Sequence, residues 1–580
     1  MNLYRKNSFV LIFLVTIFNI FSCKAETTDY SPEEVNDTAQ QEQGQTDSVN
    51  NLYNIVSFIE QPSSMSVSIN QSYTLSCSAE CSDTTIYYRW FECSDALGTT
   101  KIPLTENWTE SSTIEINGFT EMGIRYFVCA ATNAISDALA QDNSIPENTV
   151  YSELCAVAYT GLPIIVINTG DVATVDITKE EYVSCNFKLL ASDGTLTVNK
   201  ELTKKGIKGR GNQSWVYPKK GYNLNFDSKV SFFNLPASKK WCIVSNYDDP
   251  TLMHNTYASE LGTKVFNSNW NPTFVYVDVI INNEYLGNYI FCEKNTIQEG
   301  RINIQDISDV EENLLNGKTS KIIDSNGDGK KDIQDGGFVL EVDFRADADF
   351  SFQTIKGVIF TLKEPDEVTK YSQERIKQIV QQAEDSLYSN SFSDVIDLNG
   401  RLLSKWMQYI DIDSLLDWYV INEFAKQLDA PFITSVYLYY NPVDCKLYFG
   451  PIWDFDKSFG TVHRDPFDLE SPEGWFVRRE DGHAGLMSEN WISRMAQDDT
   501  FIEFLKNRWN EKKSELYLSI NTDVDDIISE INLSAELNFI KWGTDNSQAY
   551  KETWGSSVSE FKSFCNQRYE WIDSEINNQQ

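Results

Sequence analysis

The chain has 580 residues, of which 41% are hydrophobic and 13% aromatic, and its formal net charge is −37. This acidity argues against a general nucleic-acid-binding protein, which would need a basic face. The chain has no Gly-x-Ser-x-Gly elbow, and its histidines are too far apart for a His-based zinc motif, which argues against hydrolases built on histidine. The length predicts about three or four domains. The three histidines are His254, His463 and His483.

The first 23 residues have the pattern of a signal peptide for export. Arg5 and Lys6 precede an apolar run at 9–21, which is too short for a comfortable membrane span. A small residue precedes Cys23, as in a bacterial lipoprotein cleavage site, so Cys23 is the expected lipidated N-terminus. An ordinary secretory signal is the alternative. We therefore expect an exported protein on the bacterial cell envelope that meets the membrane through this lipid anchor only.

Two further regions precede residue 161. Residues 24–52 are polar and have almost no large apolar side chains, which predicts a disordered tether. Residues 53–160 contain short alternating strands that suggest a β-sandwich. The order Cys77, Trp90, Cys129 resembles the immunoglobulin-like pattern of two facing-sheet cysteines around a core tryptophan. Export permits disulfides, but their pairing stays open. This region carries no recognisable catalytic chemistry and is expected to be a spacer or a binding module.

A basic, glycine-rich stretch at 204–220 interrupts this acidic chain. It carries six lysine and arginine residues and no acidic residue. Gly206, Gly209 and Gly211 would let the backbone approach a ligand closely, and glycines combined with basic side chains form a phosphate cradle. The stretch is not a P-loop, because Gly-Lys-Ser/Thr at the required spacing is absent. A basic hairpin tip is the structural alternative.

Hydrophobic periodicity predicts the elements that follow residue 161. A strand at 164–167 opens this region, and helices account for most of the chain after residue 490. Further strands are expected at 221–227, 241–244, 274–281, 285–293, 337–343, 433–440 and 446–449, and helices at 253–265, 366–388, 413–428, 490–516 and 561–576.

Residues 324–335 have the spacing of an EF-hand calcium loop. A polar Asx-turn loop is the alternative. The expected calcium ligands at loop positions one, three, five, nine and twelve are Asp324, Asn326, Asp328, Asp332 and Asp335.

Two carboxylates follow the predicted strand at 446–449. On an extended backbone Asp454 and Asp456 would point to one side and Phe455 to the other. Carboxylates this close repel each other unless a cation lies between them, and hard oxygen ligands suit magnesium or calcium. Two aspartates in a solvated turn are the alternative. Upstream, a helix, Asp429 and a hairpin precede Asp454, which is the order of the catalytic and metal-binding aspartates in protein kinases.

Six sequence blocks in this order resemble the CotH (spore coat protein H) kinase family, over roughly residues 161–580. The resemblance implies an atypical two-lobed kinase-like domain at 161–580. Together with the small all-β immunoglobulin-like sandwich expected before it, the chain is expected to have an α+β fold. Family members use ATP and a divalent metal to phosphorylate protein serines, and some act outside the cytosol. The blocks are 206–212, 219–222, 249–252, 287–289 with Glu293, 336–338 with Glu341, and 450–456.

The resemblance also assigns roles to individual residues. Asp429 would be the catalytic aspartate, and Asp454 with Asp456 would hold Mg²⁺ or Mn²⁺. The basic side chains Arg210, Lys219 and Lys220 would face the phosphates of ATP, and Glu293 would be a carboxylate partner in the N-terminal lobe.

Two functions remain open at this point. One is an ATP- and metal-dependent atypical kinase that phosphorylates serines of an extracytoplasmic protein. The other is a catalytically inactive kinase-like protein for cell-surface binding or adhesion, in which the immunoglobulin-like module and the Ca²⁺ loop serve adhesion. His254 stands where many members have arginine, and Ser435 stands where the spore-coat members have asparagine. The sequence does not identify the protein substrate.

Overall fold

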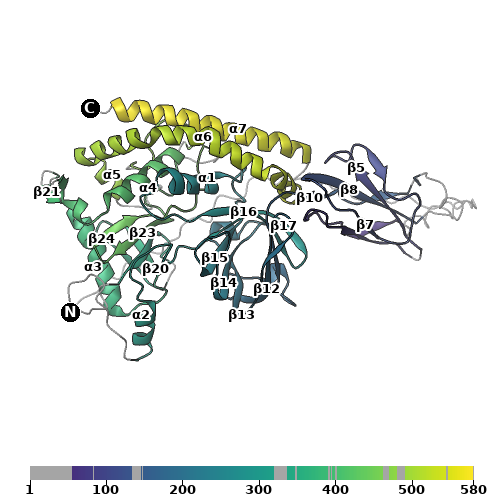
Figure 1. Cartoon of the computed structure of the whole chain (residues 1–580), viewed down its shortest axis with the longest axis horizontal. Helices are drawn as coiled ribbons and strands as arrows, with labels where there is room; N and C mark the ends of the chain where they lie inside the picture. Colours follow the sequence, from purple (N-terminus) through teal and green to yellow (C-terminus); the bar gives the residue numbers. More distant parts are fainter. Residues whose placement is uncertain are drawn as a thin grey trace, which may run out of the picture. The chain divides into compact units, whose positions relative to one another are not determined.

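The computed structural model describes residues 55–578, apart from 83, 134–144, 147, 319–335, 347–348, 390–391, 393–394, 399–400, 461–468, 480–489 and 544–546. The predicted signal peptide with Cys23, the tether and the whole proposed calcium loop at 324–335 lie outside the described residues. The described part has a mixed α+β fold whose N-terminal region is rich in strands (Figure 1).

The strands before residue 160 form small sheets. The largest has the order β2-β10-β8-β5-β6, with β9 beside β8, and the other two are β1-β4 and β3-β7. Cys77, Trp90 and Cys129 are buried in one hydrophobic cluster with Cys155, and these three cysteines are free thiols. An immunoglobulin-like class for this region stays a prediction. The strands are β1 Ser57–Glu60, β2 Met65–Ser66, β3 Tyr73–Ser76, β4 Ser78–Glu80, β5 Tyr87–Cys93, β6 Lys101–Pro103, β7 Thr113–Ile116, β8 Gly123–Thr132, β9 Val150–Tyr151 and β10 Cys155–Tyr159.

The next part of the chain forms a closed barrel in the order β11-β12-β13-β14-β15-β17-β16. Aromatic side chains fill its interior: the ring of Phe232 lies 5.0 Å from that of Trp241 and 4.9 Å from that of Phe291. The basic stretch occupies the end of β13 and the turn into β14. It therefore forms a hairpin, which was the structural alternative for this stretch. The strands are β11 Ile164–Asn168, β12 Val183–Leu190, β13 Leu196–Arg210, β14 Gly221–Val230, β15 Ser238–Val244, β16 Phe274–Ile281 and β17 Glu284–Glu293.

A second sheet, in the order β19-β20-β18-β23-β24, packs with helices around the largest core cluster. The helix α4 (Ile412–Ala425) is buried on nearly all sides, as expected for a helix that is apolar all round. The strands are β18 Phe338–Val342, β19 Ser351–Gln353, β20 Ile359–Glu364, β23 Val436–Asn441 and β24 Lys446–Phe449, with a separate hairpin of β21 Val395–Leu398 and β22 Arg401–Ser404.

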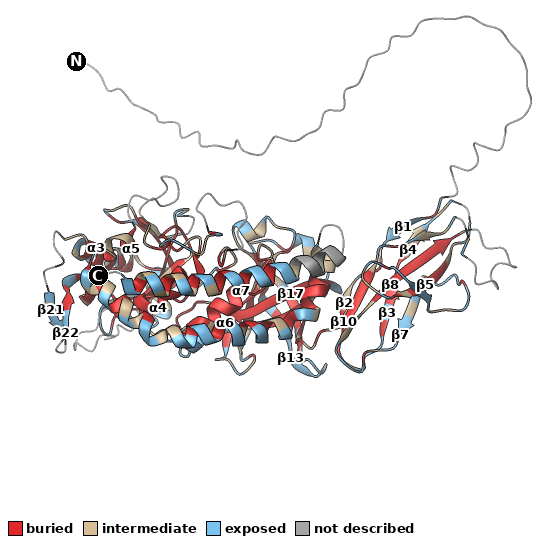
Figure 2. Ribbon diagram, turned by 90° about the horizontal axis from the view of Figure 1, so that it is seen from above, coloured by how far each residue is buried: buried red, intermediate tan, exposed pale blue. Residues whose placement is uncertain are grey.

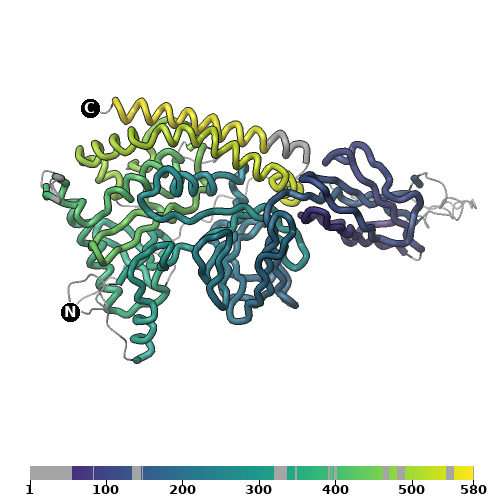
Figure 3. Tube along the Cα trace, in the orientation of Figure 1, coloured from purple at the N-terminus to yellow at the C-terminus, as the bar shows by residue number. Residues whose placement is uncertain are grey.

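The C-terminal helices are longer than the sequence pattern indicated. α6 continues to Trp542 rather than ending near residue 516, because buried Ile520, Val524 and Ile527 extend its apolar face. α6 and α7 run side by side (Figure 3), and their outer faces carry the exposed residues (Figure 2). The helices are α1 His254–Glu260, followed by a π-helical turn Leu261–Val265, then α2 Ser308–Leu315, α3 Lys370–Leu387, α4, α5 Trp491–Met495, α6 Asp499–Trp542 and α7 Ser547–Asn578.

A buried carboxylate joins the N-terminal strands to the barrel. Asp278 on β16 is fully buried, and its Oδ2 accepts hydrogen bonds of 2.7 Å from the hydroxyls of Ser66 and Thr160. Its Oδ1 accepts from the hydroxyls of Tyr285, at 3.0 Å, and Ser534 on α6, at 2.7 Å. Residues 54–580 accordingly form one compact unit. The boundary expected near residue 160 is therefore bridged by buried hydrogen bonds.

A buried ion pair fixes the end of α4, from which the chain continues to Asp429. The guanidinium of Arg568 on α7 donates to Glu423 Oε1 at 2.6 Å, and both side chains are at most 1% exposed. Arg568 Nη1 donates to the carbonyls of Pro472 and Gly474, and Nε donates to the Glu423 carbonyl. Glu423 also accepts from the backbone of residues 476 and 477. One pair thus ties α7, α4 and the segment 472–477 together.

We expect Arg568→Met to lower the free energy of unfolding by roughly 3–5 kcal/mol, because it leaves the Glu423 carboxylate buried without its cation. Chemical denaturation measures the change. Lys562→Met on the same helix is the matched control. Lys562 pairs with Asp525 at 2.7 Å on the exposed surface, where a pair contributes about 1 kcal/mol or less. Equal losses in the two variants would contradict the role given to the buried pair.

Candidate functional site

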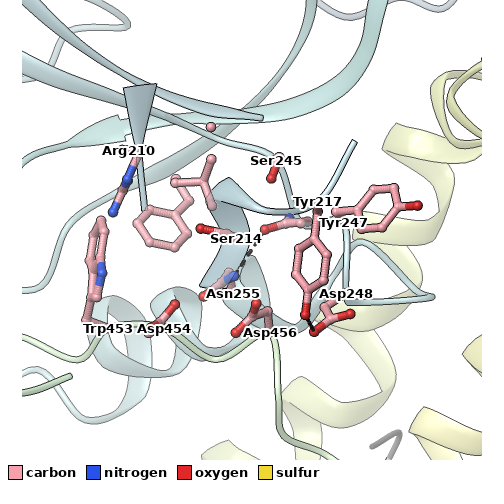
Figure 4. Close-up of a pocket in the computed structure, with 14 residues that line it drawn as sticks. Arg210, Ser214, Tyr217, Ser245, Tyr247, Asp248, Asn255, Trp453, Asp454 and Asp456 are labelled. Carbon is pink, nitrogen blue, oxygen red and sulfur yellow. Dashed lines mark hydrogen bonds between the residues drawn. The ribbon is translucent and has the colours of Figure 1, made fainter. Parts of the chain in front are cut away.

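A pocket lies between the barrel and the segment that follows β24 (Figure 4). Residues far apart in the sequence meet there, because β13, β14 and β15 form one wall and the segment 453–456 forms the opposite wall. The lining residues that carry charge, hydroxyl or aromatic chemistry include Arg210, Tyr217, Asp248, Trp453, Asp454 and Asp456.

Asp454 and Asp456 both line the pocket, and Phe455 between them is buried at 2% exposure. The alternation expected from the sequence is therefore present, but the backbone is not extended, because Asp454 has a φ of +69°. A left-handed backbone at a residue with a Cβ costs roughly 1–2 kcal/mol. Neighbours hold this conformation: Gln427 Nε2 donates to the Asp454 carbonyl at 2.8 Å, and the Ser435 hydroxyl donates to Asp454 Oδ2 at 2.9 Å.

Asp429 follows the C-terminal end of α4 and precedes the hairpin of β23 and β24, as the sequence order predicted. Lys426 ends the helix in a left-handed conformation with φ of +47°. Burial, and then the negative charge of Asp454, raise the pKa of Asp429 to about 8. Burial and the same neighbouring charge raise the pKa of Asp456 well above its usual value. Burial and the charge of Asp454 therefore favour the protonated forms of both side chains.

The side chain of His254 contacts the backbone of the segment that carries Asp454 and Asp456. Its side chain is fully buried, with Nδ1 3.1 Å from the carbonyl oxygen of Asp456 and Nε2 3.4 Å from Asp249 Oδ1. Burial lowers the pKa of His254, so the imidazole is neutral near pH 7. Asp249 also accepts hydrogen bonds from the backbone amides of Thr251 and His254, at 2.7 and 2.8 Å, in the turn before α1.

Arg210 is the basic residue of the 204–220 stretch that lines the pocket. Its guanidinium lies 5.0 Å from the ring centre of Trp453, a cation–π contact, and its charge faces Asp454. The Nη1 group is buried and has no hydrogen-bond partner among the described residues. A buried guanidinium nitrogen without an acceptor is suited to an oxygen-rich anion such as a phosphate.

The other three residues assigned to the cofactor have different surroundings. Lys219 is buried, and its ammonium donates to the carbonyls of Ser245, at 2.7 Å, and Asn288. Burial lowers the pKa of Lys219 well below its usual value. None of the three lines the pocket, so nucleotide contacts for them stay a prediction. Lys220 donates to the Trp215 carbonyl, and Glu293 lies 3.4 Å from Arg301 and accepts from the Thr273 amide at 3.1 Å.

The glycines of the basic stretch are required by packing within the hairpin. A Cβ on Gly209 would lie 2.2 Å from the Trp215 ring, and one on Gly206 would lie 2.1 Å from a backbone oxygen of β12. Gly206 and Gly211 also have φ angles of +112° and +131°. Close contacts within the barrel therefore account for these glycines, and the approach of a ligand to their backbone stays a prediction.

Sequence reasoning missed the residues that close the pocket. The Tyr217 hydroxyl donates to Asp248 Oδ2 at 2.5 Å, and Asn255 Oδ1 accepts from the Phe455 amide at 2.8 Å. Lys457 lies beside Asp248, with Nζ 3.5 Å from Oδ2. Lys457 could have been found from its place directly after the two carboxylates. The other contacts join residues 31 or more positions apart, and no local pattern signals them.

The carboxylates fit a metal that is bound together with a nucleotide. Within the described ranges, no three His, Cys, Asp or Glu side chains form a metal-binding group on their own. Mg²⁺ in kinase sites, however, takes one or two carboxylates together with substrate phosphates. Asp454 and Asp456 supply two such carboxylates in the pocket that Arg210 lines.

The family model CotH kinase protein matches residues 207–572, which is more than half of the chain. The chain belongs to the CotH kinase family. A search of curated proteins found no match. Membership implies a kinase-like fold, ATP use and an atypical kinase activity. Across the part that the structure describes, no helix has both the length and the apolar character needed to cross a bilayer.

The raised pKa of Asp429 predicts a dependence of stability on pH. Between its usual value near 3.8 and about 8, the folded state keeps a proton on Asp429 that the unfolded state has released. Stability due to this residue therefore falls as the pH rises through that interval. As the pH rises from 5 to 8 in the absence of divalent metal, we expect the melting temperature of the wild type to fall relative to that of Asp429→Asn.

Asp454→Asn tests the cause of this effect. It removes the negative neighbour, so the pKa of Asp429 should fall and the loss between pH 5 and 8 should become smaller. A melting-temperature difference between wild type and Asp429→Asn that stays constant over this range would show that Asp429 does not titrate there.

Proposed function

We propose that this protein is an ATP- and divalent-metal-dependent protein kinase that phosphorylates serine residues of a protein outside the cytosol. The observation that carries the proposal is that Asp454 and Asp456 share one pocket with Arg210, and that Asp429 is close enough for the charge of Asp454 to raise its pKa. Family membership supports the reaction class, and the sequence features of export support the extracytoplasmic substrate.

In this proposal Asp454 and Asp456 hold Mg²⁺ or Mn²⁺ together with ATP, and the bound metal neutralises phosphate charge. Arg210 directs its unpartnered Nη1 to a phosphate oxygen. Asp429 accepts the proton of the acceptor serine as the serine oxygen forms its bond to the γ-phosphorus and the bond from that phosphorus to the ADP oxygen breaks. A raised pKa suits this role, because a general base works best with a pKa near the working pH.

The inactive binding protein remains as the second candidate, favoured by one observation. Ser435 replaces the asparagine of the spore-coat members, and its hydroxyl donates to Asp454 Oδ2. A serine hydroxyl reaches less far than an asparagine amide, so a second metal position would lack a protein ligand. One metal on Asp454 and Asp456 remains compatible with the same contact.

The cellular location is proposed from the sequence alone. We infer export through the signal at 1–23 and lipid attachment at Cys23, with residues 24–52 as the tether. No nucleic-acid partner is proposed, since the net charge is −37. The protein substrate is then a component of the cell envelope or its surroundings that presents serine hydroxyls.

Phosphate transfer from labelled ATP to dephosphorylated casein tests the activity, and calorimetry measures nucleotide binding. Asp454→Asn should remove nearly all turnover, because phosphoryl transfer depends on charge neutralisation. Asp429→Asn should keep nucleotide binding and reduce turnover by roughly 10²-fold. Arg210→Met should weaken ATP binding.

Lys208→Met is the matched control for Arg210. It lies on the same strand, but its ammonium lies over the ring of Tyr182 at 4.8 Å, so ATP affinity should change little. Binding of ATP with metal, without phosphorylation that depends on either aspartate, would favour the inactive binding protein. A wild type that binds no nucleotide with metal would overturn the kinase assignment for this protein.

The loop at 324–335 gives a separate proposal of a Ca²⁺ site. A ligand that binds only the folded state stabilises it, so the melting temperature should rise with calcium. Asp328→Ala removes the ligand at loop position five and should abolish that rise, while Asp309→Ala, outside the loop, should keep it. A wild-type melting temperature that calcium leaves unchanged would rule out the site.

A further inference from the structure

Glu341 is a buried carboxylate of the second sheet that has no part in the phosphate transfer proposed above. It lies on β18 and is 5% exposed. Its Oε1 accepts a hydrogen bond from the backbone amide of Ser435 at 3.2 Å, and its Oε2 lies 2.7 Å from the ammonium of Lys363 on β20. Both carboxylate oxygens therefore have a partner, and one of these partners is the residue whose side chain contacts Asp454.

Ser435 has a backbone conformation that a serine keeps only when its surroundings hold it. Its φ of +57° lies in the left-handed region, which costs a residue with a Cβ roughly 1–2 kcal/mol. Ser435 directly precedes β23, and the register of β23 with β18 places Val436 opposite Val342. In this conformation the Ser435 amide donates to Glu341 while its hydroxyl donates to Asp454 Oδ2 at 2.9 Å. Glu341 thus holds the backbone from which the hydroxyl reaches Asp454.

A second carboxylate beside β18 holds the residue that precedes Ser435. Asp343 directly follows the strand, two positions after Glu341, and is 1% exposed. Its Oδ1 accepts hydrogen bonds from the hydroxyl of Thr434 at 3.3 Å and from Arg345 Nε at 2.8 Å. The turn that enters β23 is therefore attached to β18 at two successive residues, through buried carboxylates.

The contact with Ser435 occupies one oxygen of Asp454 and leaves the other available. Asp454 is exposed to the pocket, its carbonyl accepts from Gln427, and its Oδ2 accepts from Ser435. No hydrogen bond reaches Oδ1 from any residue that the structure describes. A carboxylate with one oxygen fixed in this way presents the other in a set direction. Partners that orient a metal ligand typically change metal affinity by roughly 10- to 100-fold.

We propose that Glu341 is a positioning residue for the metal: through Ser435 it fixes the orientation of the Asp454 carboxylate that binds Mg²⁺ or Mn²⁺ together with ATP. This inference rests on the proposed function, which makes Asp454 a metal ligand. Glu341 does not itself line the pocket, so it acts only through Ser435. The ammonium of Lys363 balances the charge of Glu341 and allows this carboxylate to stay ionised while it is buried.

The test measures Mn²⁺ affinity in the presence of ATP, by electron paramagnetic resonance of the free ion. Glu341→Met removes the acceptor of the Ser435 amide and should weaken Mn²⁺ binding roughly tenfold or more. Glu341→Gln keeps an oxygen that can accept this hydrogen bond, so its Mn²⁺ affinity should stay within about threefold of the wild type. A loss in Glu341→Gln as large as in Glu341→Met would show that the charge and not the hydrogen bond matters, and would overturn the inference.

A double-mutant cycle separates positioning from a general loss of structure. Ser435→Ala removes the hydroxyl and should itself weaken Mn²⁺ binding. Glu341→Met should then cost much less affinity in the Ser435→Ala background than in the wild type, because the contact that Glu341 fixes is already absent. Glu384→Met on α3 is the matched control. Glu384 is buried at 1% exposure and accepts from the amide of Lys356 and from Trp491 Nε1, so its loss should lower the melting temperature and leave Mn²⁺ affinity unchanged.

The outcomes separate this inference from the proposed function. Full Mn²⁺ affinity in Glu341→Met, or equal losses in the two backgrounds, would overturn the role of Glu341 and leave the kinase proposal standing. If Glu341→Met does not fold, Glu341→Asp replaces it: this variant keeps the charge but withdraws the carboxylate by one methylene, and it should show the same loss and the same dependence on Ser435. Wild-type Mn²⁺ affinity in Asp454→Asn would overturn both proposals, because Asp454 would then hold no metal.

Discussion

Repulsion among a few carboxylates is the constraint on which the site depends. Asp429 and Asp456 are pushed toward their protonated forms by burial and by Asp454. Such a cluster is stable only while its neighbours supply compensating charge and fixed geometry. Arg210 and Lys457 supply the charge, and Gln427, Ser435 and His254 hold the backbone and one carboxylate in place.

The surrounding core supplies the rigidity that this arrangement needs. Asp429 follows a helix that is buried on almost every side, and the Arg568–Glu423 pair attaches the end of that helix to α7 and to residues 472–477. On the barrel side, the hairpin that carries Arg210 is packed so closely that Gly209 has no space for a side chain. Both walls of the pocket are therefore held by buried contacts, and the charged groups need little reorganisation to meet a ligand.

The parts of the site that could be predicted from the sequence are those that lie close together along the chain. The helix, Asp429, the hairpin and Asp454 occupy 412–454 in unbroken order, so periodicity and turn residues were sufficient to locate them. The burial of Lys219 could not be predicted, because a basic residue in a glycine-rich stretch gives no sign of it. Its acceptors are the carbonyls of Ser245, directly after β15, and of Asn288 on β17, and only the folded barrel brings these two strands together. The barrel closure depends on the parallel pairing of β11 with β16, more than a hundred residues apart, which no local pattern encodes.

Asp278 has a consequence for how this chain can change during evolution. Its carboxylate is buried by hydroxyl groups from the N-terminal strands, the barrel and α6 at once, with Ser66, Thr160, Tyr285 and Ser534 as donors. Gene rearrangements readily move a region whose stabilising contacts all lie within that region. Exchange of the N-terminal strands for an unrelated sequence would remove two of the four hydroxyl donors. The buried carboxylate would then keep only two of its four hydrogen bonds. Recombination in this family member is therefore restricted at that junction, and the strand region and the kinase-like region are expected to be inherited together.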